Sequence, residues 1–149
     1  MEGQYHFKKG DYYYILYSAR SCCGPQSDYD VRVSRSKNFR GPYEKYAGNP
    51  ILYGAGHDYI SCGHGTAATT ADGRMFYMCH AYLKGDGFYA GRQPILQEMY
   101  VGDDNWVHFT SGNIAKAKQP MPFKGTVQQP LKDCEDSFDG KNIKLDWAW

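Results

Sequence analysis

The sequence predicts an all-β protein built from two four-stranded antiparallel sheet units, and two observations lead to this prediction. From residue 5 to residue 109, short runs of β-prone residues alternate with turn residues, and helical periodicity of useful length is missing. The same order of four strands then occurs twice. When the turn at 10–13 is aligned with the turn at 72–75, Glu2 falls opposite His64, 62 positions later. A repeated four-stranded sheet is typical of propeller blades, although 62 residues is longer than the usual repeat.

Residues 1–60 are predicted to form the first sheet unit. Tyr12 to Ala19 is a strongly β-prone run. Val31 and Val33 alternate with polar residues, as expected for a strand that buries one face. The predicted strands are 5–7, 12–19, 29–36 and 43–46, and the segment 49–52 is predicted to cross over to the next unit.

Residues 61–112 are predicted to form the second unit. His64 lies between Gly63 and Gly65, and glycines in a strand allow another backbone or a ligand to approach closely. An Asp72-Gly73 turn separates the first strand from an aromatic second strand. The predicted strands are 64–70, 75–82, 90–101 and 106–109.

Residues 113–149 are predicted to lie outside the two units. The segment 114–129 is rich in Lys, Pro and Gln and is interpreted as a linker. The last run, Ile143–Trp149, has strand character with nothing after it to pair with. We therefore expect this tail to be the truncated start of an accessory β-domain.

The composition argues against two classes of partner. The chain has 17 basic and 16 acidic residues, and the basic stripe typical of a nucleic-acid-binding protein is missing. No apolar run is long enough to span a membrane, and the N-terminus lacks a signal segment. The aromatic excess lies in 14 tyrosines, which suit half-buried strands and wet binding surfaces.

The cysteines do not suggest a disulfide framework or a zinc site. Five cysteines at irregular spacing are an odd number, unlike the framework of a small disulfide-rich domain. Cys62, His64, Cys79 and His80 include two metal-binding residue types, but their spacing is not that of structural zinc sites. In a strand, Cys79 and His80 also point to opposite faces. We predict no metal ligands among these residues.

Several short motifs follow one another in the order found in a known family. The matching segments are Glu2-Gly3-Gln4, Ser21–Gly24, Arg32–Tyr43, Gly63–Gly65, Gly91–Gln93, Asp103–Trp106 and Phe138–Trp149. Together they resemble glycoside hydrolase family 43, the arabinan- and xylan-degrading enzymes built on five-bladed β-propellers. One departure is Gln4, which stands where the family's Glu-Gly-Pro motif has proline. The resemblance implies about two of the five blades, with a tail that leads toward the β-sandwich found in many members.

The resemblance also implies an activity, which is inverting hydrolysis of arabinofuranosyl or xylosyl linkages with Glu2 as the general acid. The family's catalytic base lies on earlier blades, so we expect this chain to carry the acid, lack the base and be inactive alone. His64 and Arg92 match inner-strand motifs that face the substrate. The alternatives are a satisfied strand histidine and a surface arginine.

The Cys22-Cys23 pair lies on a loop that the resemblance places beside the sugar site. It is expected to be either a vicinal disulfide or two buried thiols. No cofactor is expected, although the family raises the alternative of calcium in the central channel near His64. The implied location of the complete enzyme is secreted or periplasmic.

The predicted partner is an arabinose- or xylose-containing oligo- or polysaccharide. Two further alternatives stay open. The first is a non-catalytic carbohydrate-binding or structural β-module that self-associates through its uncovered sheet faces. The second is assembly with a separate chain that supplies the missing blades.

Overall fold

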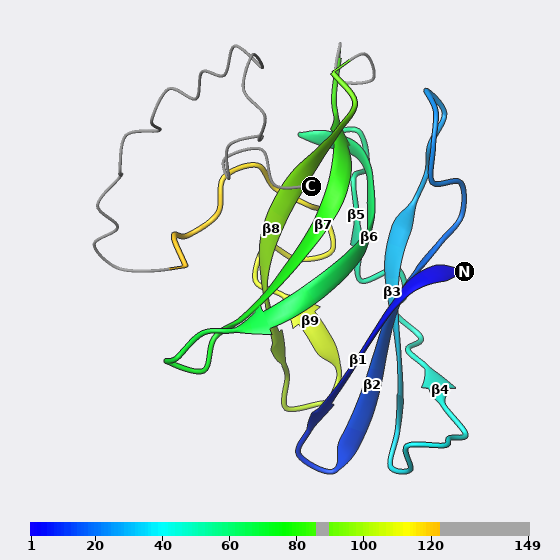
Figure 1. The fold of residues 1–149 in the computed structure, drawn as a ribbon, viewed down its shortest axis with the longest axis vertical. Coiled ribbons are helices and arrows are strands. Elements are labelled where there is room, and N and C mark those ends of the chain that lie inside the picture. The colour runs from blue at the N-terminus through cyan, green and yellow to red at the C-terminus, as the bar shows by residue number, and fades with distance from the viewer. Residues whose placement is uncertain (86–89, 123–149) are drawn as a thin grey trace, which may run out of the picture.

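The computed structural model describes residues 1–85 and 90–122, which form strands, turns and loops without a helix (Figure 1). The predicted all-β class is confirmed. The predicted accessory domain falls mainly on residues 123–149, which lie outside the described residues. No helix that could span a membrane is present in the described part of the chain.

The first sheet has β1 (Glu2–Lys9), β2 (Tyr12–Ala19), β3 (Asp30–Ser36) and β4 (Glu44–Lys45) in chain order, all antiparallel. Two predictions for this unit differ from the structure. The strand predicted at 5–7 is longer, because β1 begins at Glu2 and ends at Lys9, and the segment predicted only to cross over also forms a strand. The crossover segment 49–52 ends in a short strand, β5 (Leu52–Tyr53), which pairs with β3 beside Asp30 and Val31. The backbone N–H of Ile51 donates a hydrogen bond to Val31 O, just before β5 begins. Because this bond holds the chain beside β3, residues 52–53 pair with β3 before the chain leaves the sheet.

The second sheet has β6 (Tyr59–Thr69), β7 (Met75–Leu83), β8 (Arg92–Val101) and β9 (Val107–Phe109), again in chain order and antiparallel. β6 begins five residues earlier than predicted. The polar, glycine-rich stretch around His64 continues the strand because a bulge between Gly63 and Thr66 absorbs it.

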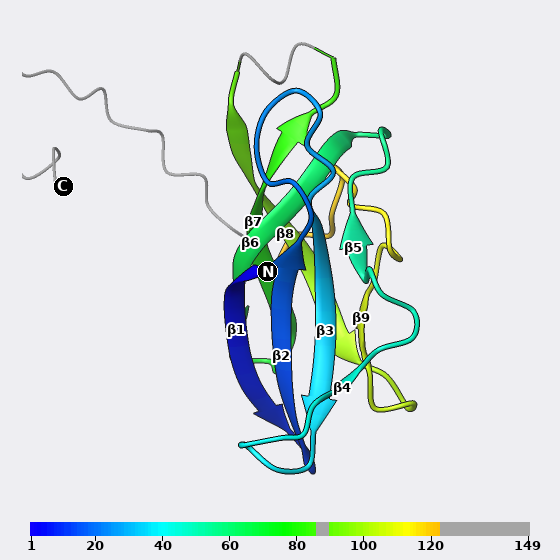
Figure 2. The ribbon, with the colours of Figure 1, turned by 90° about the vertical axis from the view of Figure 1, so that its right-hand side faces the viewer.

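A shared core lies between the two sheets. Alternate residues of each central strand point into it, as the period of two along a strand requires. The fully buried members of this core include Tyr14, Leu16, Val31, Val33, Tyr77 and Val107. The two sheets therefore fold as one packed unit, which holds the edge strand β1 in a defined place against β6 (Figure 2).

The edge strands β1 and β6 meet at Gly3 and His64. Each strand has an irregular register here, between Glu2 and Tyr5 in β1 and next to His64 in β6. Both Gly3 (φ 61°) and His64 (φ 54°) adopt the left-handed backbone conformation. A Cβ atom on Gly3 would lie 2.9 Å from the His64 Cα, so only glycine allows this approach. The contact brings the start of β1, with Glu2, to the middle of β6.

Candidate functional site

Glu2 is held by a buried tyrosine. The Tyr29 hydroxyl donates a hydrogen bond to Glu2 Oε1 at 2.8 Å. Tyr29 is 1% exposed, whereas the Glu2 side chain is exposed at the surface. Burial, followed by the hydrogen bond to Glu2, raises the pKa of the Tyr29 hydroxyl, so it stays protonated as a donor. The exposed carboxylate therefore has one oxygen fixed from the protein interior.

The Tyr29 ring packs against β6 at Gly63. A Cβ atom on Gly63 would be 2.4 Å from the Tyr29 ring, so the missing side chain makes room for the ring. Tyr29 also stacks on His80 of β7, the cross-strand neighbour of Gly63, with ring centroids 5.7 Å apart and planes 11° from parallel. The space left by the missing Gly63 side chain is therefore occupied by the Tyr29 ring and not by a ligand.

His80 links this pair to Arg92. Arg92 Nη1 lies 3.2 Å from His80 Nε2, and because a guanidinium can only donate, Nε2 accepts. The His64 ring lies 6.3 Å from the His80 ring. Burial is the largest cause that lowers the pKa of His80, followed by the charges of Arg92 and His64, while Glu2 opposes them. His80 is therefore neutral at pH 7, with the proton on Nδ1, which is buried and has no hydrogen-bond partner among the described residues.

The backbone around His64 is fixed by two side chains. His64 N donates to Ser18 Oγ at 2.7 Å, and Gly65 N donates to Tyr77 Oη at 3.0 Å. A Cβ atom on Gly65 would lie 2.3 Å from Met78 O, so this glycine lets the neighbouring strand come close, as the sequence predicted. The backbone of this segment is thus fixed, while the His64 side chain is exposed.

His64, His80 and Arg92 line an open pocket of about 490 Å³. The rest of the wall comes from Gly65, Thr66, Met78, Cys79 and Pro94. The pocket combines imidazole and guanidinium groups with an apolar floor. Such a surface can hold a polar ligand that also has an apolar face, and a sugar ring has both.

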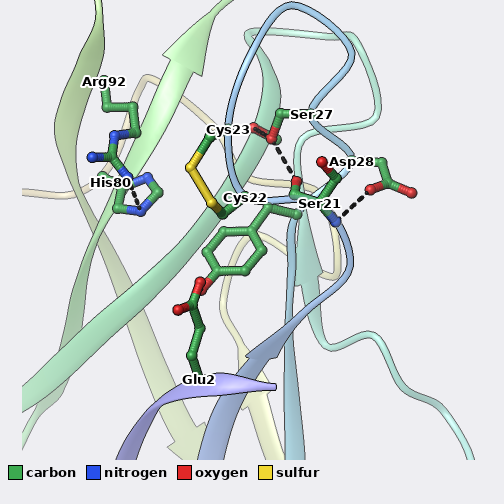
Figure 3. The surroundings of a disulfide bond; sticks show 10 residues. Glu2, Ser21, Cys22, Cys23, Ser27, Asp28, His80 and Arg92 are labelled. Carbon is green, nitrogen blue, oxygen red and sulfur yellow. Dashed lines mark hydrogen bonds between the residues drawn. A yellow bond between two sulfur atoms is a disulfide. The ribbon is translucent and has the colours of Figure 1, made fainter.

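Cys22 and Cys23 form a disulfide on the loop between β2 and β3 (Figure 3). Cys23 is exposed and Cys22 is half-buried, so of the two alternatives for this pair the structure has the vicinal disulfide, not the buried thiols. The loop is tied down by Ser27 Oγ, which donates to Ser21 O at 2.8 Å. In Figure 3 the disulfide lies above Glu2 and beside the Arg92–His80 pair.

The structure brings together the residues that the sequence singled out. Glu2, His64 and Arg92 come from three strands and meet around His80, and the roles proposed for them stay predictions. Sequence reasoning missed Tyr29 and His80 as members of this site. His80 could have been identified from strand alternation, because it lies on the face opposite Cys79, which packs in the core. Nothing in the sequence around Tyr29, apart from its β-propensity, indicated that it belongs to the site.

Metal binding finds little support here. No group of three or more His, Cys, Asp or Glu side chains in the described residues could hold a metal ion. Cys62 and Cys79 are buried in the core as free thiols, and their mutual hydrogen bond and burial raise the pKa of Cys62. Calcium near His64 stays a prediction, for which these surroundings supply imidazole and guanidinium groups rather than the oxygen ligands that calcium prefers.

Comparisons with known proteins agree on one family. The family model for glycosyl hydrolases family 43 matches residues 1–107. A non-reducing end alpha-L-arabinofuranosidase of Bacteroides ovatus is 29% identical over 158 aligned residues, which cover 99% of this chain and 28% of that protein. A xylosidase/arabinosidase of Humicola insolens is 29% identical over 156 residues, with 100% of this chain and 28% of that protein covered.

A solved structure supports the same assignment. GH43B of the Bacteroides ovatus xyloglucan PUL superimposes with a TM-score of 0.78 at 26% identity, covering 97% of this chain and 29% of that one. The fold and the sequence match place the chain among the glycosyl hydrolases. It belongs to glycosyl hydrolases family 43. The chain spans less than a third of the length of these curated relatives. The number of blades and the nature of the tail stay predictions.

Proposed function

We propose that this chain is part of an inverting glycoside hydrolase that acts on arabinofuranosyl or xylosyl linkages of plant polysaccharides, with Glu2 as the general acid. The observation that carries the proposal is the hydrogen bond from the buried Tyr29 hydroxyl to Glu2, beside a pocket lined by His64, His80 and Arg92.

The hydrogen bond suits a proton donor. Tyr29 occupies a lone pair of Glu2 Oε1, so the acidic proton of a protonated Glu2 is placed on Oε2. A general acid must hold its proton within hydrogen-bond reach of the leaving oxygen. Fixing one carboxyl oxygen from the interior leaves the other free to face a glycosidic oxygen at the surface.

Arg92 and His64 are proposed to bind the sugar. The Arg92 side chain is exposed and keeps donors that the contact with His80 does not use. His80 and Tyr29 then act as positioning residues, since His80 orients Arg92 and stacks on the tyrosine that holds Glu2.

Inverting hydrolysis needs a second carboxylate about 6.5–9.5 Å from the acid, with room for a water. Among the described residues, the side-chain contacts of this cluster (Tyr29, His64, His80 and Arg92) include one carboxylate, that of Glu2. We propose that the catalytic base comes from outside this chain, either from other parts of a longer enzyme or from a second polypeptide.

The substrate class is supported by the names of the relatives. They include the arabinofuranosidase and the xylosidase/arabinosidase above, and an arabinan endo-1,5-alpha-L-arabinosidase A of Aspergillus niger that is 30% identical over 129 residues. A solved Cellvibrio cellulosa alpha-L-arabinanase that superimposes with a TM-score of 0.64 at 27% identity was complexed with arabinohexaose. The Cys22–Cys23 disulfide is proposed to contact such a chain of sugars from above Glu2. Reduction with a phosphine should then weaken oligosaccharide binding.

The test follows binding and turnover together in the complete enzyme. Replacing Glu2→Gln should lower turnover of α-1,5-arabinotriose or β-1,4-xylotriose by about 10²–10⁴-fold. The loss should be much smaller for a 4-nitrophenyl glycoside, because that leaving group needs no proton. Asp11→Asn, an exposed change of carboxylate to amide in the β1–β2 turn, is the control. Unchanged turnover of the trisaccharides by Glu2→Gln would remove Glu2 from the role of acid.

A second candidate function is a non-catalytic carbohydrate-binding module that self-associates. A non-catalytic role is favoured because the site residues contact a single carboxylate, that of Glu2. Self-association is favoured by an exposed apolar patch on the outer face of the second sheet, formed by Met78, Leu96 and Tyr100, which are 51%, 37% and 48% exposed. Titration of the chain alone with the two trisaccharides, with an assay for new reducing ends, separates the candidates. Saturable binding that never gives turnover, even after the missing blades are supplied, would support the module.

A further inference from the structure

We propose that a second cavity, next to Tyr29 but apart from the Glu2 pocket, binds one neutral sugar residue. The sugar class rests on the proposed function, while the location and the neutral charge rest on the structure alone. The cavity has a volume of about 420 Å³, within the range of about 300–1,000 Å³ typical of small-molecule sites. It lies between the β2–β3 loop, the segment around β5 and the start of β6, and its main lining residues are Arg20, Asp28, Tyr29, Tyr53, Ile60 and Asn113.

The cavity is separate from the pocket already described. Its lining shares no residue with that of the His64 pocket. Tyr29 connects the two regions, because it belongs to the cavity wall and its hydroxyl holds Glu2. Asp28, which lines the cavity, lies in Figure 3 beyond Ser21 on the side away from Arg92 and His80.

The charged groups at the cavity neutralise one another. Asp30 is 2% exposed and receives two hydrogen bonds from Arg32, at 2.7 and 2.9 Å. Arg20 bridges Asp30 and Asp28, with Nε 3.1 Å from one carboxylate and Nη1 3.2 Å from the other. The hydrogen bond from Ser21 N, followed by the one from Arg20, lowers the pKa of Asp28, so this carboxylate is ionised at neutral pH.

This pairing decides the charge of the ligand. A cation would have to displace a guanidinium from Asp30, and an anion would have to displace two carboxylates from Arg20. A neutral molecule needs neither exchange, and it can use the donors and acceptors that the network still offers. The exposed Asn113 amide adds further polar atoms at the rim.

The remaining wall is apolar. Pro50, Tyr53, Ala55 and Ile60 supply it, while the polar groups lie on Arg20, Asp28 and Asn113. A pentose ring has C–H groups on one face and hydroxyls around its edge, so it matches a wall divided in this way.

Backbone conformation gives a second reason to expect a ligand. Arg20 (φ 72°) and Ala55 (φ 56°) are two of the four non-glycine residues with positive φ in the described chain, and both line this cavity. His64, in the other pocket, is a third. Such strained residues concentrate at functional sites because the surrounding structure must hold them in place.

The experiment is a titration of the ¹⁵N-labelled chain with α-1,5-arabinotriose and, separately, β-1,4-xylotriose, followed by heteronuclear NMR. Two saturable groups of shifted resonances are expected, one around His64 and Arg92 and one around Arg20, Tyr53 and Asn113. Ile60→Trp, which fills the cavity, should abolish the second group and leave the first unchanged. Ala47→Trp adds the same side chain at an exposed position outside both linings and is the matched control.

A milder variant covers the case in which Ile60→Trp fails to fold. Asn113→Ala should weaken the second group by about two- to tenfold, the loss expected for one neutral hydrogen bond. The outcomes separate the two proposals. Shifts around His64 and Arg92 alone, for both sugars, would overturn the second site and leave the proposed function standing. Shifts around the cavity alone would support the second site and count against sugar binding at the first. If neither group of resonances shifts saturably, both the second site and sugar binding at the His64 pocket would be overturned.

Discussion

The hydroxyl of Tyr29 lies 2.8 Å from Oε1 of Glu2, and this one hydrogen bond joins the edge strand β1 to the residue that precedes β3. Tyr29 is buried and stacked on His80, so it can hold the carboxyl group of an exposed residue close to the chain terminus. The position of Glu2 therefore depends on the interior of the fold rather than on β1 alone.

Tyr29→Phe should keep the stacking on His80 and remove the hydrogen bond. We expect the free energy of unfolding to fall by about 1 kcal/mol, less than the roughly 1.5–3 kcal/mol of a bond to a charged group, because the exposed Glu2 carboxylate can bind water instead. In a double-mutant cycle with Glu2→Ala, measured by urea unfolding, the two changes should be coupled by a similar amount. Full additivity would show that the bond contributes nothing.

Gly63→Ala should displace Tyr29, because the new Cβ would lie 2.4 Å from its ring. We expect a loss of about 1–3 kcal/mol in unfolding free energy, together with shifted NMR signals of the Tyr29 and His80 rings. Gly73→Ala is the comparison, since Gly73 has φ 84° and nothing within 4 Å of its Cβ position. It should cost about 1 kcal/mol through backbone strain and leave both rings unmoved. Equal ring shifts in the two variants would contradict the steric argument.

Arg35 clamps the two sheets together. Its Nη1 donates to Asp104 O and Asn105 O at 2.8 and 2.6 Å, and its guanidinium lies 3.8 Å from the centre of the Trp106 ring. Arg35→Ala should lower the free energy of unfolding by about 2 kcal/mol, and Arg35→Lys should recover only part of it, because lysine lacks the planar fork.

The control for the clamp is Lys37→Ala, at an exposed position whose ammonium group lies 5.6 Å from the Tyr12 ring. A change within about 0.5 kcal/mol is expected there. Chemical denaturation of all three variants measures these changes in the free energy of unfolding. Equal losses for Arg35→Ala and Lys37→Ala would show that Arg35 does not hold the two sheets together.

Acidification should destabilise the protein through His80. Its pKa is lowered from the ordinary 6.5, so as the pH falls through that value the unfolded chain takes up the proton before the folded protein does. The contribution of His80 to stability is thus complete above pH 6.5 and is lost as the pH falls through the lower pKa of the folded state.

Two measurements test this. An NMR titration of the His80 ring should have a midpoint below 6.5, and the stability lost between pH 7 and pH 5.5 should be smaller in His80→Gln than in the unchanged chain. A midpoint above 6.5 would reverse the sign and contradict the assignment of His80 as a neutral acceptor.

Most of the secondary structure was predictable, because the features that decide it are local. Strand 12–19 was predicted with the bounds that β2 has, and the start of β7 at Met75 was also predicted correctly. The misplaced boundaries fall where a non-local contact extends a strand, as at β5, or where a bulge carries the strand through glycines, as at His64 in β6.

The sequence by itself determined that the chain forms sheets, which residues of each strand share a face, and that Glu2, His64 and Arg92 are the residues to examine. Alternation of side chains with a period of two is a local property, so it can be read without knowing the fold. Only the tertiary structure decided that Tyr29 and His80 join these three residues, that Gly63 makes room for a tyrosine ring, and that a second, charge-balanced cavity lies beside Tyr29. These relationships depend on how two twisted sheets pack against each other, and the pattern within one strand carries no information about that packing.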